Sequence, residues 1–517
     1  MNNSLVYTKK KETIGVITTY FTTQMLMHDY EIIHIDKHKY EEVIHRNNIK
    51  KVIIDNDIYE LDHAWYDESR DSLLSYLKSN YIKTTVIKNS QKNLDRVFLE
   101  CEVFKSRKDQ NDNFDSSHIL LNEDLFNPMD TIKNIDIVYL HFNKIKNTPY
   151  CKLFRKDENF IYKDILLDGF KYDKLLYLIK ILKNTKVLYI NFDVDIDNII
   201  LQYIINISNL YNVFVVCDYQ YNMTPKYTYN SYSDISNFST IKIVLNNEIY
   251  KDKILTRNIR NIFINNTFFN EKSTKYQLQL INCKSNLKHV SVITSTNRKE
   301  NIYKYLKQLS KQNFVKLQVI LNTHGFSLDE NMKNKLIEKF DMEIIFLEAP
   351  KDYSLGKCLN LCIDYIKYPI VAKMDDDDFY CPNYLIDQCI SLNYSKADVV
   401  GKLSQFIYLE AENITIKRLS EEYYKYVDLV MGASLVCKTV LLKKYLFKDL
   451  NKGEDADLLK RIKQNRGRLF ANHPYDFCIF RGFDKDKHTW KISDLAMLKS
   501  SKIICYGNSL ETLCTEN

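Results

Sequence analysis

Val371-Ala372-Lys373-Met374-Asp375-Asp376-Asp377-Asp378-Phe379-Tyr380 joins an apolar strand pattern to four consecutive aspartates. Strand propensity is high before the acids and absent within them, so a buried strand should end where the acids begin. Ligands of open α/β sheets bind just outside the carboxyl ends of strands. Because clustered carboxylates repel one another, a hard divalent cation with oxygen ligands would stabilise them. The alternative is a solvated acidic loop, which is the usual role of such a run.

The sequence on the N-terminal side of this stretch predicts alternating strands and helices. Helices are expected where apolar residues recur at helical spacing, and strands where short apolar runs end in polar residues. This alternation predicts a parallel sheet with polar side chains gathered at one edge. The expected strands are His289–Thr294, Leu317–Leu321, Glu343–Leu347 and Pro369–Lys373, and the expected helices are Asn301–Phe314 and Ser354–Tyr365.

The N-terminal half shows a similar alternation, which predicts one or two Rossmann-like α/β units over residues 1–285. A polar break at residues 108–113 suggests a division near residue 115. This half contains only Gly15 and Gly169, so it offers no glycine-rich loop to bind a nucleotide phosphate. The expected strands are Thr13–Tyr20, Glu31–Asp36, Lys51–Asp55, Ile135–Phe142, Lys186–Phe192, Asn212–Asp218, Thr240–Asn246 and Asn261–Asn265; helices are expected at Asp71–Asn80 and Tyr172–Lys183.

Composition limits the class of protein. The 517 residues are 45% hydrophobic and 27% charged, as in ordinary globular proteins, and the length suggests about two or three domains. A net charge of +7 is spread thinly, without the dense basic stripe of a nucleic-acid-binding protein. The first eleven residues lack the apolar core of a signal peptide, and no stretch approaches the roughly 18 apolar residues of a membrane span, which predicts a cytoplasmic protein. The twelve cysteines lack paired spacing, which predicts free thiols in a reducing cytoplasm.

Four ordered motifs follow one another in the C-terminal half: 290–298, 354–360, 373–378, and 453–458 with His488-Thr489-Trp490. Together they resemble an inverting family 2 glycosyltransferase of the GT-A fold, and the resemblance implies such a domain at residues 286–517. The region before residue 286 weakly resembles Rossmann-type domains that are fused to such transferases in low-GC Gram-positive bacteria. The predicted fold class is therefore α/β, with a GT-A, Rossmann-like C-terminal domain preceded by Rossmann-like α/β domains.

The resemblance implies a divalent metal, Mn²⁺ or Mg²⁺, that neutralises the diphosphate of a nucleotide sugar. On the family's Asp-x-Asp pattern, Asp377 is expected to be a direct metal ligand, with Asp375 close to the metal and the ribose. Asp376 and Asp378 would then support the site or face solvent, and a frame shifted by one residue remains open. His488 resembles the histidine that some GT-A enzymes use as a further metal ligand; the alternative is a packed ring.

Inverting transfer also requires a base that takes the proton of the acceptor hydroxyl. Glu454 and Asp455 fall where the family carries its Glu-Asp pair, so Asp455 is the expected base. Glu454 would bind the acceptor or act as the base in place of Asp455. Both acids also begin a predicted helix, where they would interact favourably with the helix dipole without any catalytic role.

The resemblance also implies residues that bind the nucleotide and the diphosphate. Leu359 stands where many relatives carry an arginine, which leaves Lys357 or Lys373 to supply the positive charge. Arg298 could instead be a surface residue. The predicted donor-binding residues are Thr294, Thr296, Asn297, Arg298, Asn322, Gly356, Lys357, Asn360, Lys373, Asp375 and Asp376.

The function implied by the resemblance is metal-dependent transfer of a hexose-type sugar, with a UDP-sugar favoured as donor. The acceptor would be a hydroxyl of a cell-surface glycan precursor, free or lipid-linked, or of a protein, as in cell-wall or polysaccharide biosynthesis. Peripheral contact with the inner face of a membrane remains open. Two other classes also remain open: a sugar nucleotidyltransferase, which should carry a glycine-rich loop after its first strand, and a non-catalytic scaffold or carbohydrate-binding protein with a decayed transferase domain.

Overall fold

The structure of the chain is a computed structural model. It describes residues 11–18, 23–24, 26–27, 29–55, 69–88, 102–105, 121–142, 160–167, 172–191, 198–218, 229–231, 241–267, 269, 288–340, 342–419, 421–483, 493–508 and 510–515. The chain divides into two compact units. The first comprises residues 1–127, 131–246 and 261–284, and the second comprises residues 128–130, 247–260 and 285–517.

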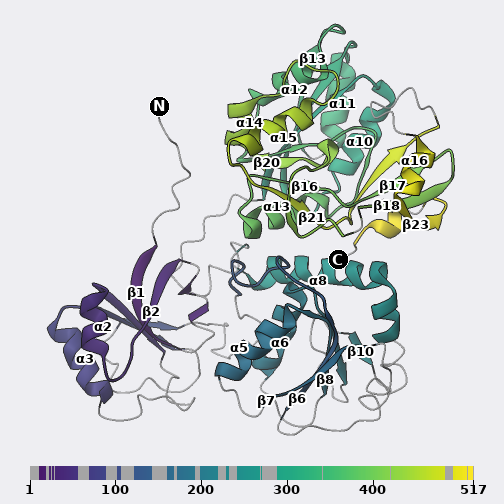
Figure 1. The fold of residues 1–517 in the computed structure, drawn as a ribbon. Helices are drawn as coiled ribbons and strands as arrows, with labels where there is room; N and C mark the ends of the chain where they lie inside the picture. Colours follow the sequence, from purple (N-terminus) through teal and green to yellow (C-terminus); the bar gives the residue numbers. More distant parts are fainter. Residues whose placement is uncertain are drawn as a thin grey trace. The chain divides into compact units, whose positions relative to one another are not determined.

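The first unit contains two sheets, each built of parallel strands (Figure 1). One has the order β2-β1-β3-β4-β5, and helices α2 and α3 pack on it through buried side chains such as Ile44, Leu73 and Leu77. Apolar residues one turn apart on the helices meet the apolar face of the strands, as the sequence pattern predicts. The elements are β1 (Glu12–Ile17), β2 (Tyr30–His34), α2 (Tyr40–Arg46), β3 (Lys51–Asp55), α3 (Ser69–Ser79), β4 (Lys83–Lys88) and β5 (Glu102–Lys105).

The second sheet of this unit has the order β10-β9-β8-β6-β7, and all its strand pairs are parallel. In chain order, both sheets therefore follow the 2-1-3-4-5 arrangement of doubly wound α/β folds. The predicted break near residue 115 lies outside the described residues. The elements are β6 (Ile135–Phe142), β7 (Tyr162–Leu167), α5 (Tyr172–Leu182), β8 (Thr185–Asn191), α6 (Asn198–Leu210), β9 (Phe214–Asp218) and β10 (Tyr229–Ser231). Helix α8 (Glu248–Asn266) is divided between the two units: its residues up to Arg260 belong to the second unit and the rest to the first.

Two strands predicted from the sequence are wrong. Residues 241–246 are helical, and Asn261–Asn265 lies inside helix α8. The β-branched and aromatic residues of these short windows favour a strand, but the buried residues of α8 recur at Leu255, Ile259, Ile262 and Phe263. This spacing is helical, and it becomes visible only over a window longer than the one that predicted the strand.

The second unit is built on an eight-stranded mixed sheet with the order β13-β12-β11-β14-β20-β16-β21-β19. β14 is buried throughout, lies parallel to β11, and ends at Lys373, as predicted, with only Met374 between it and the four aspartates. Its strands are β11 (His289–Thr296), β12 (Lys316–His324), β13 (Glu343–Ala349), β14 (Ile370–Lys373), β16 (Val399–Lys402), β19 (Lys425–Val427), β20 (Val436–Lys438) and β21 (Leu469–Asn472).

Helices cover this sheet, and a five-stranded sheet of order β15-β22-β17-β18-β23 adjoins it in the same unit. The remaining elements are η4 (Lys299–Asn301), α10 (Ile302–Leu309), α11 (Glu330–Lys339), α12 (Leu355–Ile363), β15 (Phe379–Tyr380), α13 (Tyr384–Ser395), β17 (Gln405–Leu409), β18 (Ile414–Arg418), η5 (Gly432–Ser434), α14 (Thr439–Tyr445), α15 (Glu454–Gln464), β22 (Phe477–Arg481), α16 (Asp494–Lys499), β23 (Ser501–Tyr506) and η7 (Leu510–Leu513).

The predicted α/β fold class is confirmed, and the second unit has the GT-A-like arrangement of a mixed sheet with acids after a central strand. The core explains why: Ile293, Ile320 and Val371 from the strands pack with Leu359 of α12 and Leu458 of α15. Burying such side chains contributes about 1.5–3 kcal/mol each. The packing holds β11, β12 and β14 side by side with their carboxyl ends at one edge.

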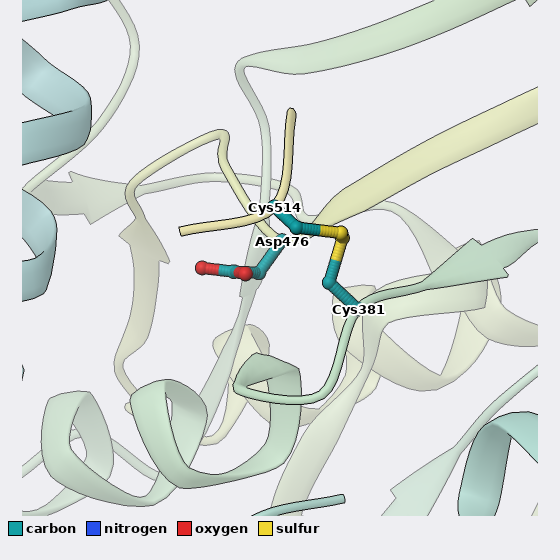
Figure 2. A group of neighbouring side chains, drawn as sticks. All are labelled: Cys381, Asp476 and Cys514. Atoms are coloured by element: carbon teal, nitrogen blue, oxygen red, sulfur yellow. A yellow bond between two sulfur atoms is a disulfide. The ribbon is translucent and has the colours of Figure 1, made fainter. Parts of the chain in front are cut away.

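The prediction of free thiols is wrong for one pair of cysteines. Cys381, directly after β15, forms a disulfide with Cys514, which lies 133 residues later in the sequence (Figure 2). Sequence spacing did not indicate this pair because the fold brings the two residues together. Among the described residues, no helix combines the length and the apolar character needed to cross a membrane.

Candidate active site

The acidic loop Asp375–Asp378 follows β14, and residues at the carboxyl end of the neighbouring strand β11 hold it. Asp376 is buried and accepts hydrogen bonds from Thr296 Oγ1 at 2.9 Å, Arg298 Nε at 3.1 Å and Asn301 Nδ2 at 3.0 Å, as well as from Arg298 Nη2. Its oxygens are therefore engaged by protein donors, and its role is to fix the loop against β11.

The carboxylates on either side of Asp376 are the accessible ones. The side chains of Asp375 and Asp377 are 40% and 30% exposed, and each has one cationic neighbour. Lys373 Nζ lies 2.8 Å from Asp375 Oδ1, and Arg298 Nη1 lies 2.8 Å from Asp377 Oδ2. This alternation of accessible, buried and accessible acids corresponds to the frame predicted from the Asp-x-Asp pattern.

Carboxylate crowding in this loop fits a divalent cation. Burial raises the pKa of Asp377, and the neighbouring Asp375 and Asp376 raise it further against the opposing effect of Arg298. Burial, Asp377 and Asp375 raise the pKa of Asp378, whose carboxylate is buried and accepts the Phe480 N–H at 3.2 Å. Oxygen ligands at Asp375 and Asp377 are the kind that Mg²⁺ and Mn²⁺ prefer. His488 lies outside the described residues.

Lys373 connects the acidic loop to the Glu-Asp pair. Its ammonium group is buried, and Asp375, Asp455 and Glu454 raise its pKa against the effect of burial. Asp375, one of the predicted metal ligands, and the predicted base Asp455 therefore lie around the same cation. Burial raises the pKa of Glu454, whereas Asp455 is only partly buried and accepts the Ala456 N–H at 2.7 Å. Of the two acids, Asp455 is the more accessible to an acceptor.

The predicted donor residues on α12 contact a different segment, residues 447–451, which leads towards α15. The Gly356 N–H donates to Leu450 O at 3.0 Å, and a Cβ on Gly356 would overlap the Lys448 carbonyl oxygen. Asn360 hydrogen-bonds both backbone groups of Phe447, at 2.8 and 2.9 Å. Lys357 forms an exposed ion pair with Asp449 at 2.8 Å. These contacts hold the segment that precedes Glu454.

The other predicted donor residues lie around the end of β11. Thr294 is buried and donates to the Met374 carbonyl at 2.8 Å, so it supports the acidic loop through its backbone. Asn322 is buried beside it on β12 and donates to Ser295 Oγ at 3.3 Å. Asn297 is exposed at the turn after β11. Asn297 and Arg298 are therefore the members of this group that a ligand can reach most directly.

Three residues that contact the site were not predicted from the sequence. They are Asn301, which donates to Asp376; Tyr380, whose hydroxyl accepts the Asp375 N–H at 2.9 Å; and Gly432, which lies against Asp455. The chain has only ten glycines, so the isolated Gly432 was the one available signal. Neither Asn301 nor Tyr380 belongs to a pattern that separates it from the many other asparagines and tyrosines of the chain.

No family model matches the chain, and no curated protein matches its sequence. Among solved structures, the mannosyltransferase PcManGT from Pyrobaculum calidifontis, in complex with GDP-Man and Mn²⁺, is 17% identical, with a TM-score of 0.31, over 38% of this chain and 58% of that chain. TarS 1–349 from S. aureus in complex with UDP-GlcNAc is 16% identical, with a TM-score of 0.31, over 40% of this chain and 62% of that chain. The chain thus spans less than two thirds of the length of these structures.

Proposed function

We propose that the chain is a metal-dependent, inverting glycosyltransferase of the family 2 type, with its catalytic domain in residues 286–517. The observation that carries this proposal is that accessible Asp375 shares the buried Lys373 with the Glu454–Asp455 pair, while accessible Asp377 lies two residues further along the same loop. Transfer from a nucleotide sugar needs these two acidic groups together: one that holds a cation for the leaving diphosphate, and one that takes a proton.

In the proposed reaction, a hydroxyl of a glycan precursor or protein attacks the anomeric carbon of a nucleotide-diphosphate sugar, with a UDP-sugar favoured. The Asp455 carboxylate takes the hydroxyl proton, the new glycosidic bond forms, and the bond between the anomeric carbon and the diphosphate oxygen breaks with inversion. Mn²⁺ or Mg²⁺, held by Asp375 and Asp377, would supply Lewis-acid stabilisation of the leaving diphosphate. Arg298 and Asn297 would bind the nucleotide, and Glu454 the acceptor.

The two alternative functions are less well supported by this site. A sugar nucleotidyltransferase should carry glycines in the loop after its first strand, and residues 294–298 contain none. A scaffold with a decayed transferase has no reason to retain this many clustered carboxylates, because like charges at close range repel one another.

The function is tested by the release of nucleoside diphosphate from UDP-N-acetylglucosamine and GDP-mannose in the presence of Mn²⁺. We expect release with one of these donors, and we expect Asp377→Asn to reduce it about tenfold or more because a metal ligand is lost. Asp364→Asn, which removes an exposed carboxylate after α12, is the matched control and should keep wild-type release. Release that is unchanged in Asp377→Asn, or equal with chelator, would contradict the metal role.

A further inference from the structure

Gly432 leaves the space that the Asp455 carboxylate occupies. A Cβ on this glycine would overlap Asp455 Oδ2 and Cγ. The φ angle of Gly432 does not lie in the left-handed region, so the requirement for glycine comes from the carboxylate and not from the backbone conformation. Gly432 begins the short helical turn η5, which lies between β19 and β20.

The same turn also holds the acidic loop, through Tyr380. The Tyr380 hydroxyl accepts the Asp375 N–H at 2.9 Å and donates to the Ala433 carbonyl at 2.8 Å. Tyr380 is buried, and its own N–H donates to Gln308 Oε1 at 2.9 Å. The phenol therefore joins the backbone of a predicted metal acid to the residue that follows Gly432.

The turn is itself fixed at its far end. Ser434 Oγ donates to the Met431 carbonyl at 2.9 Å and accepts the Lys402 N–H at 2.8 Å, while the Ser434 carbonyl accepts from Gln388 Nε2 at 3.3 Å. These bonds tie η5 to strand β16 and helix α13, so a change at Gly432 cannot be relieved by moving the whole turn. The shift would fall instead on the Asp455 side chain.

We propose that the Gly432–Ser434 turn is the positioning element that sets where Asp455 lies relative to Asp375. Gly432 leaves room for the Asp455 carboxylate. The Ala433 carbonyl accepts a hydrogen bond from the Tyr380 hydroxyl, which in turn accepts the Asp375 N–H. This inference rests on the proposed function. The base and the metal acid come from segments about 80 residues apart in sequence, and the turn contacts Asp455 directly and is connected to Asp375 through the Tyr380 hydroxyl.

Small errors in the placement of a reacting group have large effects on rate, since a misplacement of about 1 Å can cost about 100-fold. Gly432→Ala is therefore expected to lower kcat for nucleoside diphosphate release by about 10- to 100-fold, measured with whichever of the two donors the wild-type protein uses, with the donor KM changed by less than about threefold. Tyr380→Phe keeps the ring but removes the hydroxyl, so it should raise the donor KM as well as lower kcat.

The matched control is Gly467→Ala. A Cβ there would overlap the Ile462 side chain at the other end of α15, so this variant disturbs the packing of the same helix without contacting Asp455. It should keep the wild-type kcat. In an Asp455→Asn background, Gly432→Ala should lower kcat by less than about twofold more, because residues that act through one group are not additive.

A kcat for Gly432→Ala equal to that of Gly467→Ala would overturn the inference. It would also be overturned if Gly432→Ala lowered kcat in the Asp455→Asn background as much as it does in the wild-type protein. If Gly432→Ala does not fold, Tyr380→Phe decides, and unchanged kcat and KM in that variant would overturn the inference equally. Absence of UDP and GDP release by the wild-type protein would instead overturn the proposed function, and this inference with it.

Discussion

Asp455→Asn is expected to lower sugar transfer, measured as release of nucleoside diphosphate, by about 10²- to 10⁴-fold, which is the range that a general base contributes. The amide is nearly isosteric with the carboxylate but cannot accept the proton of the acceptor hydroxyl. Metal-dependent binding of the nucleotide should remain within about threefold of wild type, because the groups expected to hold the cation are Asp375 and Asp377.

Asp457→Asn is the control for this experiment. Asp457 lies in the same first turn of α15, but its carboxylate pairs with Arg461 at 2.6 Å and with Lys448 at 2.6 Å. Both substitutions remove one negative charge beside the helix N-terminus, so they change the helix-dipole interaction alike. If both variants lost activity equally, Glu454 and Asp455 would have only a helix-stabilising role. If Asp455→Asn retained turnover, the base would have to be Glu454 or another group.

Arg260→Met is expected to destabilise the second unit by about 3–5 kcal/mol, the usual effect of breaking a buried ion pair from one side. Arg260 lies on α8 and is fully buried. Its Nε and Nη2 each lie 2.7 Å from an oxygen of Asp387, and Nη2 lies 2.9 Å from Asp476 Oδ2. Without the guanidinium, both carboxylates would remain buried with too few positive partners.

The stability change can be measured as a shift of the urea unfolding midpoint, followed by tryptophan fluorescence or circular dichroism. Arg257→Met makes the same chemical change one turn earlier on α8, where the side chain is only partly buried, and should cost no more than about 0.5 kcal/mol. Equal midpoints for the two variants would contradict a stabilising role of the buried cluster around Arg260.

Several parts of the site were predictable because they depend on local sequence. The end of β14 at Lys373 follows from an apolar run that stops at the acids, and the start of α15 at Glu454 follows from a glycine, two acids and a helical apolar pattern. In both cases the neighbours along the chain determine the structure, whereas the burial of Asp376 between Asp375 and Asp377 depends on the distant residues Thr296, Arg298 and Asn301.

The missed features depend on contacts between distant parts of the chain. Arg298 and Asp376 are 78 residues apart, Arg260 and Asp387 are 127 apart, and the two cysteines of the disulfide are 133 apart. No local pattern specifies such partners. The packing of the segment 447–451 against Gly356, Lys357 and Asn360 is another such contact, and the donor-binding role of these three residues stays a prediction.

The central claim is that Asp375 and Asp377 form a cation-dependent site for a nucleoside diphosphate. The most direct measurement is a calorimetric titration of the full chain with UDP, and with GDP, CMP and dTDP for comparison, first with Mn²⁺ and then with excess chelator. We expect one nucleotide, UDP in the favoured case, to bind with Mn²⁺ and to lose its binding when the chelator is present. Binding that is the same with and without the metal, or no binding of any of the four nucleotides, would contradict the account.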